Sequence, residues 1–463
     1  MDFIANIVDA VNGVVWGWPM LILLVGTHLF LTFRLRFIQS HVFKGIKLTF
    51  TKDAEASGDV TQWGALATAL SATLGTGNII GVATAIVRGG PGAVVWLWIT
   101  GLFGIATKYG EAILAIKYRV RTSDGTMLGG PMYAAERGLN AKWLGVLFAI
   151  FGAIACFGIG NLVQVNGVAA NLQNTFSVPP IATGIVVAVI TLIVIVGGIK
   201  AIAKVAEKVI PFMAVLYVTG CLIILVINFN YLGAAFALIL SAAFSTQALI
   251  GGMTGYTVER AMRFGIARGL FSNEAGLGSA PIAAAAAITR NPVRQGLVSM
   301  SQVFWDTIII CAIGGLMFVS SVIKRPDDFI NADGGLISGA VFARTAFEDL
   351  GFIGPIIVTI AIVLFAWTTV LGWGYYGERC IEYLFGKKAL LPFKIIYGGM
   401  TFVGAIVALD LVWDIADMFN AFMAIPNLIT LIGLSGVIVK LTKDYLWDKN
   451  LDAVDPEPIL EIN

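Results

Sequence analysis

Charge is what this sequence has least of. Only 13% of its 463 residues are Asp, Glu, Lys or Arg, about half the share usual in soluble domains. Apolar residues make up 58% of the chain, and its mean hydropathy is +0.87. A chain of this length cannot cover a water-facing surface with so few charges, so the composition predicts a protein embedded in a membrane.

Histidine and cysteine are also scarce. His28 and His41 are too few for a histidine-rich metal site. Each cysteine stands alone within or at the end of an apolar segment, which argues against a disulfide scaffold. The four are Cys156, Cys221, Cys311 and Cys380. A net charge of +2 leaves no basic surface that would neutralise many phosphates, which excludes nucleic acid as a partner.

Long apolar runs are abundant. A helix needs about 20 residues to cross the hydrocarbon layer of a bilayer. Eleven segments satisfy this requirement, and the first lacks the basic start of a cleaved signal peptide. They lie near 17–36, 62–87, 92–117, 143–171, 179–198, 209–229, 235–258, 297–322, 353–384, 391–410 and 413–440. The predicted fold is all-α, a polytopic membrane protein of eleven transmembrane helices.

Lys and Arg are distributed unevenly between the predicted loops. With the N-terminus outside the cell, 25 of the 30 fall on the cytoplasmic side and four on the outer side. Because basic residues favour the cytoplasmic side of a membrane, we expect a multi-pass protein of the cell membrane. Its N-terminus is predicted outside and its C-terminus in the cytoplasm, which requires an odd number of spans.

The second span contains glycines and polar residues in its middle. The cluster consists of Thr73, Gly75, Thr76, Gly77 and Asn78. A helix in lipid cannot leave backbone groups unpaired, so unwinding here would free peptide groups to bind a ligand. Taken alone, this span leaves a second interpretation open, because glycines spaced four apart also allow close helix packing.

The seventh span repeats the pattern. Its segment Ala243–Gly255 again places polar residues among glycines in the middle of the membrane. This span lies five spans after the second and is predicted to run in the opposite direction. Two interrupted helices at matching positions are typical of an inverted-repeat transporter that binds its substrate at the bilayer midplane.

The predicted organisation is one extra helix followed by two repeats of five. Residues 1–61 form the extra N-terminal helix and an amphipathic segment on the inner surface. Residues 62–232 and 233–445 form the two repeats, and 446–463 form a cytoplasmic tail, frayed from 452 onward. No catalytic constellation of a membrane enzyme and no repeated filter ring of a channel is apparent.

Four segments resemble motifs of one known family. Gly89–Gly104 is similar to the signature of the sodium:alanine symporters, also called alanine or glycine:cation symporters, and Gly75–Ile79 resembles their broken-helix motif. Gly269–Pro281 and Leu371–Cys380 resemble two further motifs of that family. The resemblance spans nearly the whole chain. It implies sodium-driven symport of alanine or glycine into the cell, through a LeuT-like fold.

A small amino acid defines which groups its site needs. Free N–H groups at Thr76 and Gly77, after a break at Gly75, suit a carboxylate. An ammonium needs oxygen acceptors, and Phe244 with Trp367 would limit the side chain to a hydrogen or a methyl. The candidate substrate-binding residues are Thr73, Gly75, Thr76, Gly77, Asn78, Gln164, Phe244, Ser245, Gln247 and Trp367. For Gln164, a role in helix packing alone remains the alternative.

Sodium, the expected coupling ion, favours several oxygen ligands. The resemblance to LeuT-like folds implies a site made of the carbonyls of Ser71 and Leu74 and the hydroxyls of Thr368 and Thr369. Alternatively, these hydroxyls bond back to their own helix. A second sodium ion near Asn78 is a further option. We expect no organic cofactor. The lipid bilayer surrounds the protein, and no obligatory protein partner is inferred.

Charged residues within the spans allow more than one interpretation. Lys108 and Glu111 are three residues apart on one helix, as expected for a structural ion pair or, alternatively, a proton relay. Asp306 is the best candidate if protons drive transport instead of sodium. The segment Ser272–Pro281 is interpreted as a re-entrant or surface helix on the inner side. A carrier of the same fold for another small solute is the alternative function.

Overall fold

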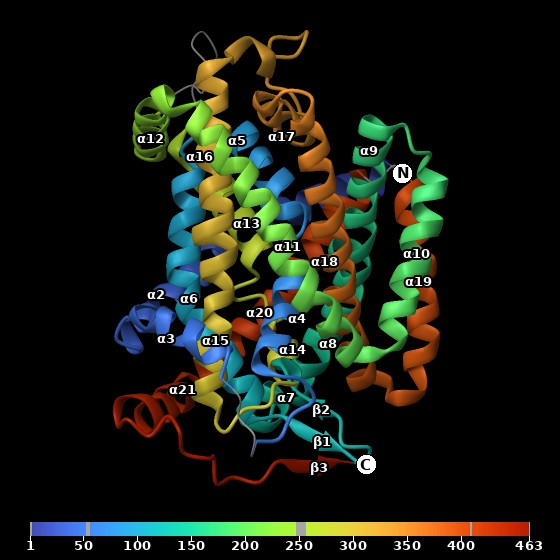
Figure 1. Ribbon diagram of the computed structural model, residues 1–463. Helices are drawn as coiled ribbons and strands as arrows, with labels where there is room; N and C mark the ends of the chain where they lie inside the picture. The colour runs from blue at the N-terminus through green and yellow to red at the C-terminus, as the bar shows by residue number, and fades with distance from the viewer. Residues whose placement is uncertain (1, 52–55, 247–255, 408–409, 463) are drawn as a thin grey trace.

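The computed structural model describes residues 2–51, 56–246, 256–407 and 410–462. These residues form a bundle of helices with a small three-stranded sheet at one end (Figure 1). The helices of the N-terminal half are α1 (Asp2–Val15), α2 (Trp18–Arg34), α3 (Val42–Thr49), α4 (Gln62–Thr73), α5 (Val82–Gly89), α6 (Ala93–Lys117), α7 (Pro131–Gly138), α8 (Lys142–Phe157), α9 (Val163–Phe176), α10 (Pro180–Val196) and α11 (Gly198–Ile227).

The C-terminal half is also mainly helical. Its helices are α12 (Phe229–Phe244), α13 (Val258–Asn273), α14 (Pro281–Ala284), α15 (Pro292–Val303), α16 (Ala312–Lys324), α17 (Gly339–Phe347), α18 (Ile353–Phe385), α19 (Leu390–Ile406), α20 (Asp410–Gly433) and α21 (Ser435–Thr442). Segments of π-helix are η2 (Gly77–Gly81), η3 (Gly158–Leu162), η4 (Phe304–Cys311) and η8 (Lys443–Trp447), and short 3₁₀ turns are η1 (Ile38–His41), η5 (Pro326–Phe329), η6 (Glu348–Leu350) and η7 (Lys387–Ala389).

Local sequence explains where several helices begin. The Thr61 side chain accepts a hydrogen bond from the Gly64 amide at 2.9 Å and caps α4. Asn291 caps α15 in the same way, and Pro292 occupies its first position. Such caps satisfy amides that have no partner within the helix, and proline there loses no hydrogen bond. The two central helices α4 and α15 therefore start at defined residues.

The helices are long and apolar enough for a multi-pass membrane protein. Among the described residues, eight helices qualify as membrane spans, and the bent pair Gln62–Thr73 and Gly77–Gly89 adds a ninth. Two predicted spans differ from this set. The helix α10 is apolar but has 17 residues, and α12 is apolar but has 16.

The seventh predicted span, 235–258, is helical over residues 235–244 and does not continue as one helix beyond them. The helix α12 ends at Phe244, Ser245 has an extended backbone, and the next helix begins at Val258. The predicted break partly falls on 247–255, outside the described residues. The helix α12 is a shorter apolar helix at the same end of the bundle as α17 (Figure 1).

The opposite end of the bundle carries the small sheet, in the order β2-β1-β3. Here β1 (Val120–Thr122) pairs antiparallel with β2 (Met127–Leu128) and parallel with β3 (Leu460–Ile462). The prediction of a frayed tail is wrong, because β3 belongs to this sheet. An ion pair between Lys117 and Glu457, at 2.7 Å, also holds the tail. Backbone bonding of this kind removes the freedom expected of a terminal segment.

The same end joins the segments that flank α4 and α14. Val60 and Ala287 form a β-bridge, and the Ile288 amide donates to the Val60 carbonyl at 2.8 Å. The Arg119 guanidinium donates to the carbonyls of Ala287 at 2.8 Å and Ser57 at 3.0 Å. Burial lowers the pKa of Arg119 to about 10, so this group remains charged at neutral pH.

Candidate functional site

The first interrupted helix runs from α4 through η2 into α5 and bends by 54°. Its break frees peptide groups that neutral side chains take up. The Gly75 amide donates to Asn78 Oδ1 at 3.0 Å, and the Thr76 amide donates to Gln164 Oε1 at 3.1 Å. A Cβ atom on Gly75 would lie 2.6 Å from Thr369 Oγ1, so only glycine fits this close approach.

A second interruption lies between α13 and α14, in residues 274–280. Gly276 and Gly278 have φ angles of +88° and +83°, which residues with a side chain rarely adopt. The segment Ser272–Pro281, interpreted from the sequence as a re-entrant or surface helix, is therefore instead the break of a second helix. It lies beside the first, because Ser272 Oγ is 2.8 Å from Asn78 Nδ2.

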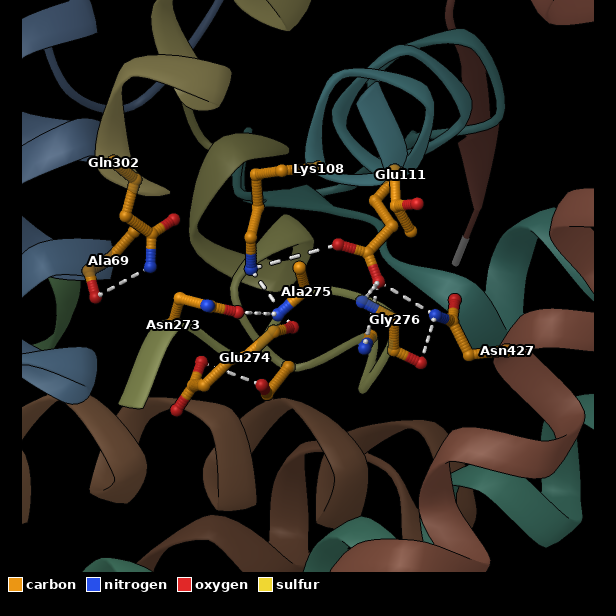
Figure 2. Close-up of polar contacts among 12 residues, drawn as sticks. Ala69, Lys108, Glu111, Asn273, Glu274, Ala275, Gly276, Gln302 and Asn427 are labelled. Carbon is orange, nitrogen blue, oxygen red and sulfur yellow. Dashed lines mark hydrogen bonds and ion pairs between the residues drawn. The ribbon is translucent and has the colours of Figure 1, made fainter. Parts of the chain in front are cut away.

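Charged side chains of α6 hold this second break (Figure 2). Glu111 Oε1 accepts the amides of Gly276 at 3.0 Å and Gly278 at 3.1 Å, and Asn427 Nδ2 at 2.7 Å. Lys108 Nζ donates to the carbonyl of Glu274 at 3.0 Å. The predicted pairing of Lys108 with Glu111 is confirmed at 3.7 Å. Both side chains are buried, so the pair satisfies peptide groups that have no access to water.

A small buried cavity lies between the two interruptions. Its volume is about 10 Å³, enough for about one water molecule. The lining residues come from both breaks and from the neighbouring helices: Ala72, Thr73, Gly75, Gly77, Ile159, Gln164, Phe271, Leu277, Thr369 and Trp373. Bound to this site, a solute would meet peptide groups, one side-chain amide, two threonine side chains and an apolar wall.

A larger cavity of about 420 Å³ lies beside the small one, on the side of η2 and α5. Gly77 and Phe271 line both cavities. The Phe271 ring stacks on Trp413 at 6.3 Å, and the Arg268 guanidinium lies 5.3 Å above the same ring. Arg268 also pairs with Asp417 at 3.8 Å. Phe271 therefore stands at the boundary between the larger and the smaller cavity.

Two of the four predicted cation ligands, Thr369 and the Leu74 carbonyl, meet at the end of α4. Thr369 Oγ1 lies 3.2 Å from the Leu74 carbonyl and 3.0 Å from the carbonyl of Phe365 in its own helix. Thr368 Oγ1 bonds back to its own helix, and Ser71 Oγ donates to the Thr68 carbonyl at 2.7 Å. The structure thus brings Thr369 and Leu74 together, while the hydroxyls of Thr368 and Ser71 are used within their own helices.

A polar network on the other side of the break surrounds Asp306. Asn78 Nδ2 donates to Asp306 Oδ1 at 2.6 Å. Ser272 and Thr307 donate to Oδ2 at 2.8 and 2.7 Å. Asp306 is fully buried and lies in η4 of the continuous helix from α15 to α16. These donors stabilise negative charge on Asp306, while its full burial disfavours that charge.

Several predicted substrate residues lie elsewhere. Phe244 is 64% exposed, and its ring contacts Trp96 with 5.8 Å between the ring centres. Ser245 Oγ donates to the Ser241 carbonyl one turn earlier. Neither residue lines the small cavity, because α12 ends before it reaches the breaks. Gln247 lies outside the described residues.

The aromatic wall also differs from the prediction. Trp367 does not line the small cavity, whereas Trp373 does. Sequence reasoning also missed Phe271 and Leu277 as lining residues. The signal is present in the two glycines and the proline that follow Ser272, since such residues interrupt a helix. The sequence analysis instead interprets the segment Ser272–Pro281 as a re-entrant or surface helix, because it places the second interrupted helix earlier in the chain, at 235–258.

Two interrupted helices that face each other across a buried cavity define a membrane transporter of the LeuT fold. A solved structure of that fold, MhsT in complex with L-phenylalanine, superposes with a TM-score of 0.60 at 16% identity, covering 85% of this chain and 95% of that one. The chain belongs to the sodium:alanine symporter family, whose model matches residues 1–457. It is therefore a multi-pass membrane transporter and not an enzyme.

Two relatives are similar to this chain over nearly their whole length. The sodium/alanine symporter AgcS of Methanococcus maripaludis is 51% identical, covering 96% of this chain and 98% of its own. The putative sodium/proton-dependent alanine carrier protein YrbD of Bacillus subtilis is 36% identical, covering 98% of this chain and 94% of its own.

Proposed function

We propose that this protein is a symporter that uses a sodium gradient to carry alanine or glycine into the cell by alternating access. The observation that carries this proposal is the buried cavity between two interrupted helices, lined by Gly75, Gly77 and Gln164. The cavity of about 10 Å³ has room for about one water molecule, so the two breaks would move apart to admit a small amino acid. Similarity to AgcS, a sodium/alanine symporter, supports the same substrate class.

The substrate is proposed to lie across the break of the first helix. Its carboxylate would take the amides of Thr76 and Gly77, which lie at the start of η2 where the helix dipole is positive. Thr73, Asn78 and Gln164 would supply the neutral polar contacts. Trp373 and Phe271 would limit the size of the side chain.

Sodium is proposed to bind where α4 ends, between the carbonyls of Ser71 and Leu74 and the hydroxyls of Thr368 and Thr369. Four oxygen atoms of this kind suit a hard monovalent cation. The short distance between Thr369 Oγ1 and the Leu74 carbonyl, 3.2 Å, supports this choice. Sodium would therefore tie α18 to the first break and favour the small buried cavity.

The arrangement in the membrane is part of the proposal. We assign the N-terminus to the outside and the C-terminus to the cytoplasm, following the distribution of Lys and Arg. The two inverted repeats would run from α4 to α11 and from α13 to α20, each starting with an interrupted helix. The helix α12 would connect them on the outer side.

Uptake by the purified protein in lipid vesicles tests this function. An inward sodium gradient should drive saturable uptake of labelled alanine, with unlabelled glycine as a competitor. Potassium in place of sodium serves as the control. Uptake that ignores the sodium gradient would contradict sodium coupling, and the absence of any alanine uptake would contradict the substrate.

Proton coupling is the second candidate, and one residue favours it. Asp306 is a fully buried carboxylate that contacts Asn78 in the first interrupted helix. Buried carboxylates in transporters often carry protons, and the name of YrbD includes protons. A proton gradient that drives alanine uptake without sodium, and no longer does so after Asp306→Asn, would favour this candidate.

A further inference from the structure

Three carboxylates share one ammonium group beside the second break. Glu111, Glu274 and Asp306 are 2%, 1% and 0% exposed, and Lys108 is 1% exposed. Electrostatic interactions link Glu274 to each of the other three groups. Isolated charges are costly in such surroundings and are normally paired or neutralised. The cluster therefore has more negative than positive charge to accommodate.

Nearby groups on other helices do not restore the balance. His28 on α2 bonds Thr107 Oγ1 through Nδ1 at 2.7 Å, while its buried Nε2 has no partner among the described residues. A charged imidazole would leave this N–H unpaired, so the neutral form fits the site. Tyr376 on α18 also interacts with Glu274, and its buried hydroxyl has no partner within the described part of the chain.

The three carboxylates differ in how well their negative charge is stabilised. Asp306 accepts three side-chain donors. Glu111 accepts two backbone amides and one side-chain amide, and it pairs with Lys108. Glu274 accepts only the Ser279 hydroxyl, at 2.7 Å, among the residues that the structure describes. Hydrogen bonds to the charged form favour ionisation, so Glu274 is the least stabilised anion of the three.

Two buried oxygen atoms beside the second break lack a hydrogen-bond donor among the described residues. No described residue donates a hydrogen bond to Glu111 Oε2 or to Gln302 Oε1, although both atoms are buried. Figure 2 shows both side chains around the break that contains Glu274. Buried acceptors without a donor are costly. An additional proton in this cluster would offset part of its excess negative charge.

We propose that the second break is a proton-binding site, and that the Glu274 carboxyl group holds the proton. The proton neutralises the carboxylate that has neither an ionic partner nor a set of donors among the described residues, and it leaves the pair Lys108–Glu111 balanced. The balance is simple: one proton from water binds a glutamate oxygen, and no other bond changes. A movement of residues 274–280 that exposed Glu274 would release this proton to water.

Infrared spectroscopy of the purified full chain in lipid tests the proton directly. A protonated carboxyl group gives a carbonyl band that a carboxylate lacks. At neutral pH the native protein should show such a band. Glu274→Gln should remove it, whereas the matched change Glu348→Gln, at an exposed glutamate, should leave it in place. No band in the native protein, or a band that survives Glu274→Gln, would overturn the proposal.

A second variant covers the case in which Glu274→Gln does not fold. Glu111→Gln keeps an acceptor for the amides of Gly276 and Gly278 but leaves Lys108 without its carboxylate. Lys108 can then balance Glu274, so the band should disappear although Glu274 is still present. Persistence of the band in this variant would contradict the proposed charge balance, while Asp306→Asn should retain it.

The link between this proton and transport rests on the proposed function. If that link holds, sodium-driven alanine uptake by the native protein should depend on pH through Glu274, and Glu274→Gln should flatten the pH profile. An unchanged profile would separate the proton from transport. Absence of alanine uptake in the native protein would instead contradict the proposed function, and the infrared result would still decide whether the proton is bound.

Discussion

The two interrupted helices solve the same problem with different chemistry. At the first break, the freed amides of Gly75 and Thr76 are taken up by the neutral side chains of Asn78 and Gln164. At the second, a buried ion pair on α6 takes up two amides and a carbonyl (Figure 2). Hydrogen bonds to charged groups are roughly twice as strong as those between neutral groups.

This difference assigns separate tasks to the two breaks. Neutral partners can be exchanged for a ligand at small cost, so the first break suits a site that fills and empties. Charged, buried partners are costly to separate, so the second break should rearrange less readily than the first. The comparison predicts that damage at the second break affects folding, while damage at the first affects transport.

The largest expected effect follows from Glu111→Ala. This change leaves Lys108 and the amides of Gly276 and Gly278 without their partner, which costs about 3–5 kcal/mol for a broken buried pair. Thermal unfolding in detergent should show a strongly lowered midpoint. Glu348→Ala, at an exposed position, is the matched control. Similar midpoints for both variants would remove the contrast between the two breaks.

Gly75→Ala should damage the first break without unfolding the protein. The added Cβ would lie 2.6 Å from Thr369 Oγ1 and 3.1 Å from Gln164 Oε1. Overpacking of this kind costs about 1–3 kcal/mol, and here it falls on the proposed substrate and sodium ligands. We expect alanine uptake to fall by about tenfold or more. Gly399→Ala, which meets no atom within 4 Å, should transport normally; equal losses in both would contradict the site.

Thr369→Val should weaken sodium binding more than it weakens folding. The change removes the hydroxyl near the Leu74 carbonyl and keeps the shape of the side chain. Loss of one buried polar contact costs about 1–3 kcal/mol, so the sodium concentration for half-maximal uptake should rise by about tenfold. Thr401→Val removes a buried hydroxyl that bonds within α19. The sodium assignment fails if both variants respond alike.

The smallest effect concerns substrate size. Trp373→Phe should enlarge the small cavity and admit amino acids slightly larger than alanine, with a gain of about fivefold, since we expect about 1 kcal/mol, the lower end of the range for one methylene. Competition of larger neutral amino acids with labelled alanine measures it. Trp367→Phe, outside the cavity lining, should leave the competition profile as it was. The reverse result would restore Trp367 as the wall.

Much of the fold could be predicted from patterns that physics makes strict. Backbone groups in lipid must be paired, so long apolar runs indicate spans and the central glycines at Gly75 and Gly77 indicate a break. The bend of 54° confirms that interruption. The pairing of Lys108 with Glu111 was also predictable, because residues three apart share one face of a helix.

The second break was harder to locate from the sequence. An apolar segment with glycines near 243–255 matched the expected pattern better than the more polar segment after Ser272. The structure shows why the polar segment is tolerated: Glu111 and Asn427, distant in sequence, satisfy its backbone. Local composition cannot reveal hydrogen-bond partners that are distant in the sequence. For the same reason, it could not predict that Trp373 lines the small cavity.

The β-bridge between Val60 and Ala287, with Arg119 bonded to both flanks, has a mechanical consequence. Under the proposed orientation, it joins the cytoplasmic halves of the two interrupted helices, so that they move as one rigid body. A path to the cytoplasm on that side then opens in one of two ways. Either α4 and α14 move together as one body, or the backbone hydrogen bonds between the Val60 and Ala287 segments break first. The free energy needed to break this backbone bridge and the Arg119 hydrogen bonds would thus contribute to the barrier for opening on the cytoplasmic side.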